Sequence, residues 1–128
     1  MKAVTLSLFL LAASAPPAFA GSCPSQGAQM ARTELLFGAG HVSAVQWKSF
    51  LAHEVTPRFP KGLTALDGSG QWNDAKGRLI AEPSHVLILW HPPGADADAR
   101  IDAIRDAYKS RFHQQSVMRV DGADCVSF

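Results

Sequence analysis

Two histidines enclose an apolar segment near the middle of the chain, and their side chains are the first candidates for chemistry. In the segment HVLILWH, His85 and His91 are an even number of residues apart, so in a strand they share one face. Residues 31–40 alternate in the same way and place Arg32 and Glu34 together on one face. If these faces coincide, the four side chains lie over an apolar floor, where they could bind a small anionic or phenolic ligand or transfer a proton. The alternative is that Arg32 and Glu34 form an exposed ion pair and that the histidines lie at strand ends near water.

A second candidate set belongs to the stretch TPRFPKGLTALDGSGQW, residues 56–72. Arg58 lies between two prolines, which stiffen the backbone on both sides of it. Arg58 could point toward Gln71 and Trp72 and form a binding rim with a guanidinium and an aromatic wall. It could instead hydrogen-bond the last carbonyl groups of the preceding helix, where the helix dipole favours a cation. In that case the stretch is a rigid connection from a helix to a strand.

The spacing of the histidines does not favour a metal site. Six residues of extended strand separate His85 from His91 by roughly 20 Å, which is too far for one ion. The chain has no HExxH, CxxC, P-loop or GxGxxG motif, and no serine or cysteine stands in a recognisable nucleophile motif. We therefore expect no metal and no cofactor.

The start of the chain and its two cysteines indicate the compartment. Residues 1–20, MKAVTLSLFLLAASAPPAFA, have the basic start, apolar stretch and small-x-small ending of a secretory signal peptide. The sequence thus predicts an exported protein, periplasmic or secreted, with a single domain over residues 21–128. In such a protein Cys23 and Cys125 are expected to form a disulfide. The sequence AGSC also resembles a poor lipobox, so a lipid anchor on Cys23 is the alternative.

Charge and hydropathy exclude other classes of protein. Removal of the leader takes away one lysine and leaves eleven basic and eleven acidic side chains, which are interspersed along the chain. A neutral domain lacks the basic surface that phosphate neutralisation requires, so nucleic acid is not an expected partner. No later segment approaches the length of a transmembrane helix.

The order of periodic segments predicts the fold. Ser43 and Gln46 have the spacing of a capping box, and the helix that they begin should end before Pro57. A second helix is expected with apolar positions at three- and four-residue spacing from Ile101 to Phe112. Strands are expected around these helices, which gives the order β-α-β-β-α-β. This order predicts an α+β, ferredoxin-like fold with a four-stranded antiparallel sheet and two helices on one face.

Several segments resemble the family known as domain of unknown function 3574, whose members are small, usually exported bacterial proteins. The resemblance runs from about Arg32 to Phe128 and is carried by the segments RTELLFG, VTPRFPKGLT, GQW, AYKSRFHQQSV and CVSF. It implies a single exported domain and supplies no reaction or catalytic residue.

The histidine segment is apolar on both faces, although a sheet with helices on one side should be polar on the other. We expect the side chains of Val86, Ile88 and Trp90 to face the helices. Leu87 and Leu89 would then join Leu36 in an exposed apolar patch and form a homodimer interface. The leading hypothesis is a non-catalytic module that self-associates or binds a ligand or partner through this face. The alternative is a small cofactor-free enzyme with Glu34 or His85 as general base and Arg32 or Arg58 holding an anion.

Overall fold

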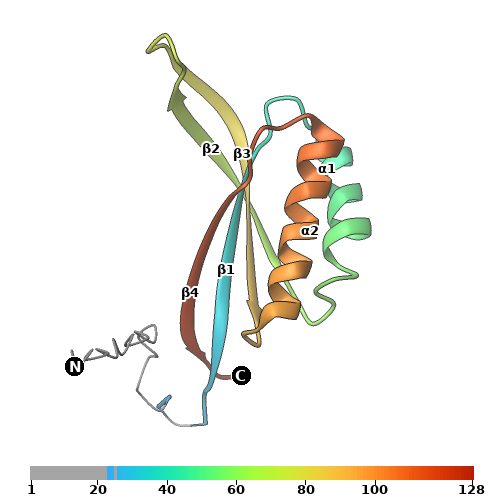
Figure 1. Ribbon diagram of the computed structural model, residues 1–128, viewed down its shortest axis with the longest axis vertical. Coiled ribbons are helices and arrows are strands. Elements are labelled where there is room, and N and C mark those ends of the chain that lie inside the picture. Colours follow the sequence, from blue (N-terminus) through green and yellow to red (C-terminus); the bar gives the residue numbers. More distant parts are fainter. Residues whose placement is uncertain (1–22, 25) are drawn as a thin grey trace, which may run out of the picture.

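The computed structural model describes residues 23–24 and 26–128, so the predicted signal peptide lies outside the described residues. Within these residues three segments are helical and four are strands, and they follow the predicted order because α1 and η1 together form the first predicted helix (Figure 1). They are β1 (Ala28–Gly38), α1 (Ala44–Phe50), η1 (Leu51–Val55), β2 (Thr64–Asn73), β3 (Leu79–His91), α2 (Ala95–Phe112) and β4 (Met118–Val126).

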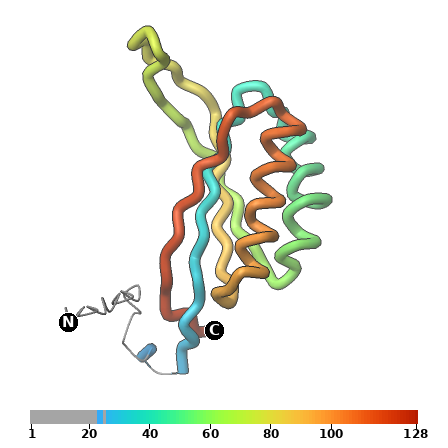
Figure 2. The backbone as a smooth tube through the Cα atoms, viewed as in Figure 1, coloured from blue at the N-terminus to red at the C-terminus, as the bar shows by residue number. Residues whose placement is uncertain are grey.

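The four strands form one antiparallel sheet with the order β2-β3-β1-β4. α1 and α2 lie side by side on one face of this sheet, and the other face carries no helix (Figure 1, Figure 2). The predicted ferredoxin-like arrangement is therefore confirmed. None of the helices in the described part of the chain has the length and apolar character needed to cross a membrane.

The first helix begins and ends where the sequence indicates. The Ser43 hydroxyl accepts a hydrogen bond from the Gln46 backbone N–H, and the Gln46 side chain accepts one from the Ser43 N–H, which completes the capping box. The helix continues from α1 into the π-helical turn η1, and Thr56 N–H donates to the Leu51 carbonyl at 2.8 Å. Thr56 itself keeps helical dihedral angles of φ −55° and ψ −42°, and the regular hydrogen-bond pattern stops because Pro57 has no backbone N–H to donate.

β2 and β3 extend beyond the rest of the sheet as a hairpin arm, residues 69–83 (Figure 2). The turn at its end uses Gly77 at φ +72°, a conformation that favours glycine. β3 runs through Pro83 without a break, because β1 ends opposite Ser84 and the missing N–H of Pro83 therefore loses no partner in β1.

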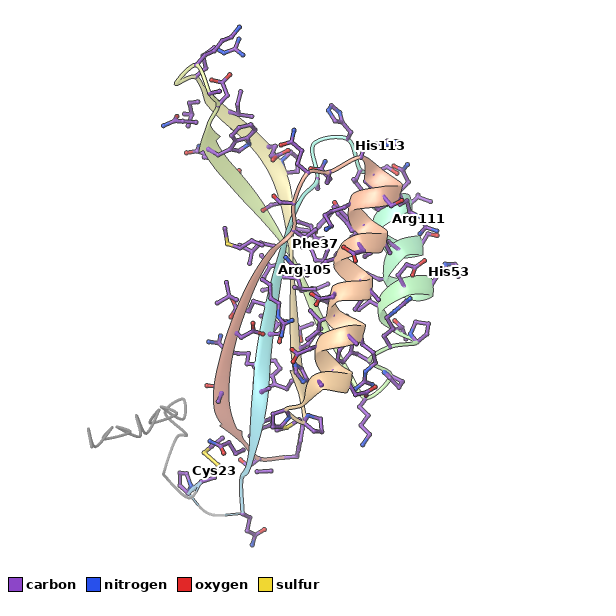
Figure 3. All side chains as sticks on the ribbon, viewed as in Figure 1. Cys23, Phe37, His53, Arg105, Arg111 and His113 are labelled. Atoms are coloured by element: carbon purple, nitrogen blue, oxygen red, sulfur yellow. A yellow bond between two sulfur atoms is a disulfide. The ribbon has the colours of Figure 1, made fainter. Side chains whose placement is uncertain are left out.

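The core lies between the sheet and the helices, where side chains from both layers meet (Figure 3). Leu35 and Phe37 of β1 are fully buried, and so are Leu87 and Leu89 of β3. The sequence-based placement of Leu87 and Leu89 on the open face was wrong. Leu87 lies directly across from Leu35, and side chains paired across an antiparallel ladder point to the same face.

Cys23 and Cys125 form a disulfide with an S–S distance of 2.13 Å, as predicted. Cys125 is paired with Gln29 in the ladder between β4 and β1, so the bridge joins the start of the described chain to its last strand. The bond uses the sulfur that a lipid anchor on Cys23 would need.

Candidate functional site

His85 is on the helix-covered face of the sheet, not on the open face where it was predicted. Its ring stacks on Trp47, with ring centres 4.2 Å apart and planes 5° apart. Nδ1 lies 2.8 Å from Oδ1 of Asp67, while Nε2 is buried without a hydrogen-bond partner. The ring therefore serves as part of the aromatic packing around α1.

His91 also points to the helix side and is 5% exposed, which again corrects the prediction. Its Nδ1 donates to the Pro92 carbonyl at 2.9 Å, and its Nε2 lies 3.0 Å from the Thr33 hydroxyl. Thr33 in turn donates to Oδ1 of Asp121 at 2.8 Å. Both ring nitrogens thus have partners within the protein, which allows the imidazole to be buried.

Asp121 connects this chain of hydrogen bonds to the surface through Arg119. The Arg119 guanidinium forms ion pairs with Asp121 and with Asp98 of α2. Burial acts to lower the pKa of Arg119, but the hydrogen bonds to Asp98 and Asp121 outweigh it, so this pKa lies above its usual value. The network ties β4 to α2.

Arg32 and Glu34 do lie on the open face, where they form an ion pair. Nε of Arg32 is 2.9 Å from Oδ2 of Asp124 on β4, although the angle there is not that of a hydrogen bond. The three side chains are 38%, 27% and 46% exposed, and one guanidinium beside two carboxylates leaves one negative charge uncompensated. The predicted ion pair is present, but both predicted histidines are on the opposite side of the sheet.

Arg58 forms the helix-end contact that the sequence offered as one alternative. Its Nη1 donates to the Glu54 carbonyl at 2.6 Å and to the Glu54 carboxylate at 2.9 Å. Gln71 and Trp72 lie in the hairpin arm, and Trp72 is eight residues along β2 from Thr64, or roughly 26 Å. The structure therefore does not bring Arg58, Gln71 and Trp72 together.

The open face carries apolar side chains in rows that cross the strands. One row runs through all four strands, and its members are Met118, Leu36, Val86 and Leu66. The next rows add Val120, Ile88 and Trp90. We call these seven side chains the apolar rows. Met118, Leu66, Val120 and Trp90 are 61%, 50%, 44% and 40% exposed.

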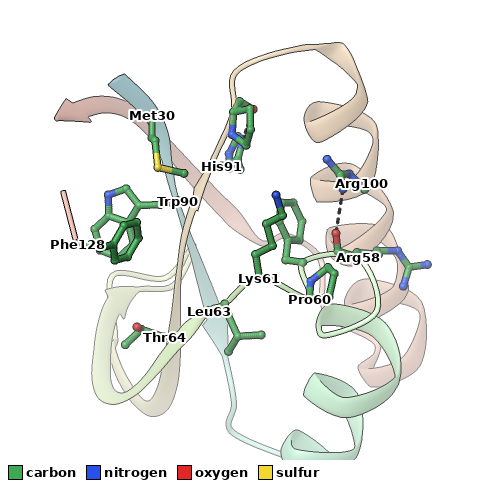
Figure 4. Close-up of a pocket in the computed structure, with 13 residues that line it drawn as sticks. Met30, Arg58, Pro60, Lys61, Leu63, Thr64, Trp90, His91, Arg100 and Phe128 are labelled. Carbon is green, nitrogen blue, oxygen red and sulfur yellow. Dashed lines mark hydrogen bonds between the residues drawn. The ribbon is translucent and has the colours of Figure 1, made fainter. Parts of the chain in front are cut away.

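A pocket of about 650 Å³ opens at the end of the sheet near the β3–α2 connection (Figure 4). Its apolar wall includes Met30, Phe59, Leu63, Trp90 and Phe128. In Figure 4, Met30, Trp90 and Phe128 lie on one side and Arg58 and Arg100 on the helix side.

The cations of this pocket differ in how they are held. Arg100 donates from Nη1 to the Arg58 carbonyl at 3.1 Å, pairs with Asp96 at 3.0 Å and lies 5.1 Å from the centre of the Phe59 ring. Lys61 also lines the pocket, and it forms no ion pair with any of the described residues. Among the residues that the structure describes, no acidic side chain lines this pocket.

Sequence reasoning identified only Arg58 and His91 among the residues of this pocket. It missed Lys61, Arg100 and Phe128, which come from three segments that are far apart along the chain. The proline-bounded loop was a usable signal, because a rigid loop with exposed cations can form a binding rim. In the part of the chain that is described, no three His, Cys, Asp or Glu residues are grouped to hold a metal ion.

The fold and these surfaces define a small α+β domain, and comparison with known proteins shows the family to which it belongs. The model of the family described as "Protein of unknown function (DUF3574)" matches residues 32–128, and the chain belongs to this family. None of the functionally curated proteins matches the sequence significantly.

Two solved structures of phage SAM lyase share the fold at low identity. A phage SAM lyase in complex with S-methyl-5'-thioadenosine matches with a TM-score of 0.58 and 13% identity, over 87% of this chain and 97% of the lyase. The apo form of a phage SAM lyase matches with a TM-score of 0.54 and 16% identity, over 84% of this chain and 94% of the lyase. A hydantoinase/carbamoylase family amidase from Burkholderia ambifaria matches with a TM-score of 0.36 and 21% identity, over 77% of this chain and 28% of the amidase.

Proposed function

We propose that this protein is an exported, non-catalytic domain that forms a homodimer through the open face of its sheet. The observation that carries the proposal is the row of four apolar side chains, Met118, Leu36, Val86 and Leu66, which crosses every strand. Scattered apolar side chains are normal on a protein surface, but a contiguous patch generally has an occupant.

The size of the face is sufficient for a second copy of the chain. β1 and β3 are paired over residues 31–38 and 84–91, which gives a length of about 27 Å. The width of a four-stranded sheet is roughly 19 Å. Two such faces would bury on the order of 1,000 Å², which is near the lower limit for a specific interface.

The charges of the face also suit a copy of itself. Arg32 is paired with Glu34 and Asp124 in the same chain, so this cluster carries only one uncompensated negative charge on each copy. A two-fold axis through the apolar rows would place identical apolar patches against each other. A partner with a strongly charged surface would meet no surface of complementary charge on this face.

The alternative of an acid–base enzyme has less support from the geometry. Glu34 is on the open face, whereas His85 is stacked on Trp47 on the helix side. A general base and its partners have to converge on one point, and these do not. The likeness to phage SAM lyase concerns the fold alone, so it adds no substrate to this chain.

Export is supported by two features of the chain. A disulfide between Cys23 and Cys125 is typical of an oxidising compartment. The order of residues 1–20 is that of a signal peptide, and mass spectrometry of the protein secreted by a host would detect its removal.

Sedimentation velocity tests the homodimer. We expect the processed chain to sediment as a dimer and Leu66→Asp to sediment as a monomer, because the carboxylate would be buried without a partner. Leu79→Asp is the matched control, since Leu79 is 64% exposed in the hairpin arm and lies outside the apolar rows. A wild-type chain that is monomeric at hundreds of micromolar, or a Leu66→Asp variant that remains dimeric, would contradict the proposal.

A further inference from the structure

The pocket at the end of the sheet has a rim that is rigid before any ligand arrives. Pro57 and Pro60 restrict the backbone on either side of Phe59, whose side chain is inserted into the core and is 6% exposed. Arg100 fastens the same loop to α2 through its hydrogen bond to the Arg58 carbonyl. Because this part of the rim is already formed, ligand binding costs less ordering entropy there.

The walls of the pocket suit a flat apolar group. Trp90 is 40% exposed and Phe128 is fully exposed, and both lie on the same side of the hollow (Figure 4). Aromatic side chains favour stacked or edge-to-face contact with another ring, and each such pair adds to simple burial. The volume of about 650 Å³ is within the usual range for small-molecule sites.

The charge of the pocket favours an anion, and one cation is available to meet it. Arg58 is engaged by Glu54, and Arg100 is engaged by Asp96 and by the loop backbone. Lys61 has no such partner among the described residues, and its ammonium group can follow a ligand because its side chain is flexible. The acidic partners Glu54 and Asp96 do not line the hollow.

We propose that this pocket is a binding site for a small aromatic carboxylate, with the ring against the wall formed by Trp90 and Phe128 and the carboxylate on Lys61. His91 contributes only the surface of its ring, because both of its nitrogens are held by Pro92 and Thr33. The site therefore binds its ligand without an imidazole free to transfer a proton. The pocket shares Trp90 with the apolar rows, but neither Leu66 nor Met118 lines it, so Leu66→Asp changes the homodimer surface without changing a pocket residue.

The chain offers a direct readout, since it has three tryptophans and each gives one indole signal in a nitrogen–proton correlation spectrum. The probe is trans-cinnamate, and the matched neutral probe is cinnamamide, which has nearly the same shape. We expect cinnamate to shift the Trp90 indole signal in a saturable way and to leave the Trp72 signal unchanged. Trp72 is the control because it is 53% exposed on the hairpin arm. Trp90→Phe and Trp72→Phe assign the two signals.

Variants of lysine test the anion contact. We expect Lys61→Gln to weaken cinnamate binding about three- to tenfold, in the range expected for one charge-assisted contact. Lys76→Gln is the matched control, because Lys76 lies in the hairpin turn far from the pocket. Cinnamamide should bind more weakly than cinnamate to the wild type and equally to wild type and Lys61→Gln.

Three results would overturn the inference: no saturable shift at Trp90, equal affinity for cinnamate and cinnamamide, or equal loss in Lys61→Gln and Lys76→Gln. The titration is repeated with Leu66→Asp to separate this test from that of the homodimer. Binding that persists in a monomeric variant supports the site whatever the outcome for the dimer. A wild-type dimer that binds no cinnamate rejects the site and leaves the dimer intact.

Discussion

The disulfide between Cys23 and Cys125 should supply a large part of the stability of this domain. The two cysteines are 102 residues apart, so the bond closes nearly the whole described chain into one loop. The loss of chain entropy in the unfolded state corresponds to roughly 4.7 kcal/mol for a loop of about 100 residues. A small domain has a net free energy of unfolding of only about 5–15 kcal/mol. The double variant Cys23→Ser/Cys125→Ser should therefore be near the limit of folding.

Urea denaturation followed by far-ultraviolet circular dichroism measures this loss. We expect the double variant to lose about 3–5 kcal/mol, and its m-value to rise because the open chain exposes more surface when it unfolds. The midpoint of thermal unfolding should fall by roughly 12–40 °C, at about 4–8 °C for each kcal/mol in a domain of this size. Both cysteines are changed together so that no free thiol can form bonds between molecules.

The position of the bond predicts which region opens first. Cys125 faces Gln29 in the ladder between β4 and β1, near the ends of both strands. Without the bond, amide exchange should increase first around this end of β4, and the Leu35 region of β1 should remain protected. A loss below about 1 kcal/mol with an unchanged m-value would refute the loop-closure reasoning. It would mean that the unfolded chain keeps its ends together in some other way.

Two further predictions test the core. Leu87→Ala should lower the free energy of unfolding by about 2–5 kcal/mol in urea, because Leu87 is fully buried. Leu79→Ala, in the exposed hairpin arm of the same strand, should change it by about 0.5 kcal/mol or less, and equal effects would contradict the burial of Leu87 in the core. Burial, followed by the charge of Glu82, raises the pKa of Tyr108 to about 12 from 10.0, so the folded state retains this proton over a range where the unfolded state loses it. The contribution of Tyr108 to the free energy of unfolding is fully present below pH 10 and decreases as the pH rises toward 12. At pH 11 the free energy of unfolding is lower by roughly 1.4 kcal/mol. Urea denaturation at pH 8 and pH 11 should show this loss in the wild type but not in Tyr108→Phe, and an equal loss in both would contradict it.

Local features of this chain could be predicted without the structure because short-range chemistry specifies them. The capping box at Ser43 and Gln46 depends on groups three residues apart, and the end of the first helix depends on Pro57. The hydrogen bond from Arg58 to the Glu54 carbonyl was one of two predicted alternatives for the same reason. A helix end has unpaired carbonyls, and a neighbouring arginine can reach them.

The capping of the second helix shows where a local rule fails. An aspartate at position 96 or 98 has the side chain for an N-cap, but the helix begins at Ala95 with Gly94 as its N-cap. Asp98 instead pairs with Arg119 of β4. The side chain of Asp98, which local preference would have used as an N-cap, is thus engaged in an ion pair between α2 and β4.

The face of β3 could not be predicted because its sequence is apolar on both sides. Alternation separates Leu87 and Leu89 from Val86 and Ile88, but it does not say which set faces the helices. A preference for placing His85 and His91 near water gave the wrong answer. Thr33 and the Pro92 carbonyl provide hydrogen bonds for His91, and Trp47 provides a stacking partner for His85. Thr33 and Trp47 are distant along the chain, so periodicity cannot reveal them.

By itself, the amino-acid sequence determined the order of the elements and the antiparallel topology, and it favoured the pairing of Cys23 with Cys125 over a lipid anchor on Cys23. These follow from periodicity, from breakers and from the few ways in which such elements can connect. The tertiary structure alone decided which side of the sheet is open, and it assembled the pocket of Lys61, Trp90 and Phe128. The physical reason is that both depend on the register between β1 and β3, and a shift of one residue would exchange the two faces of a strand.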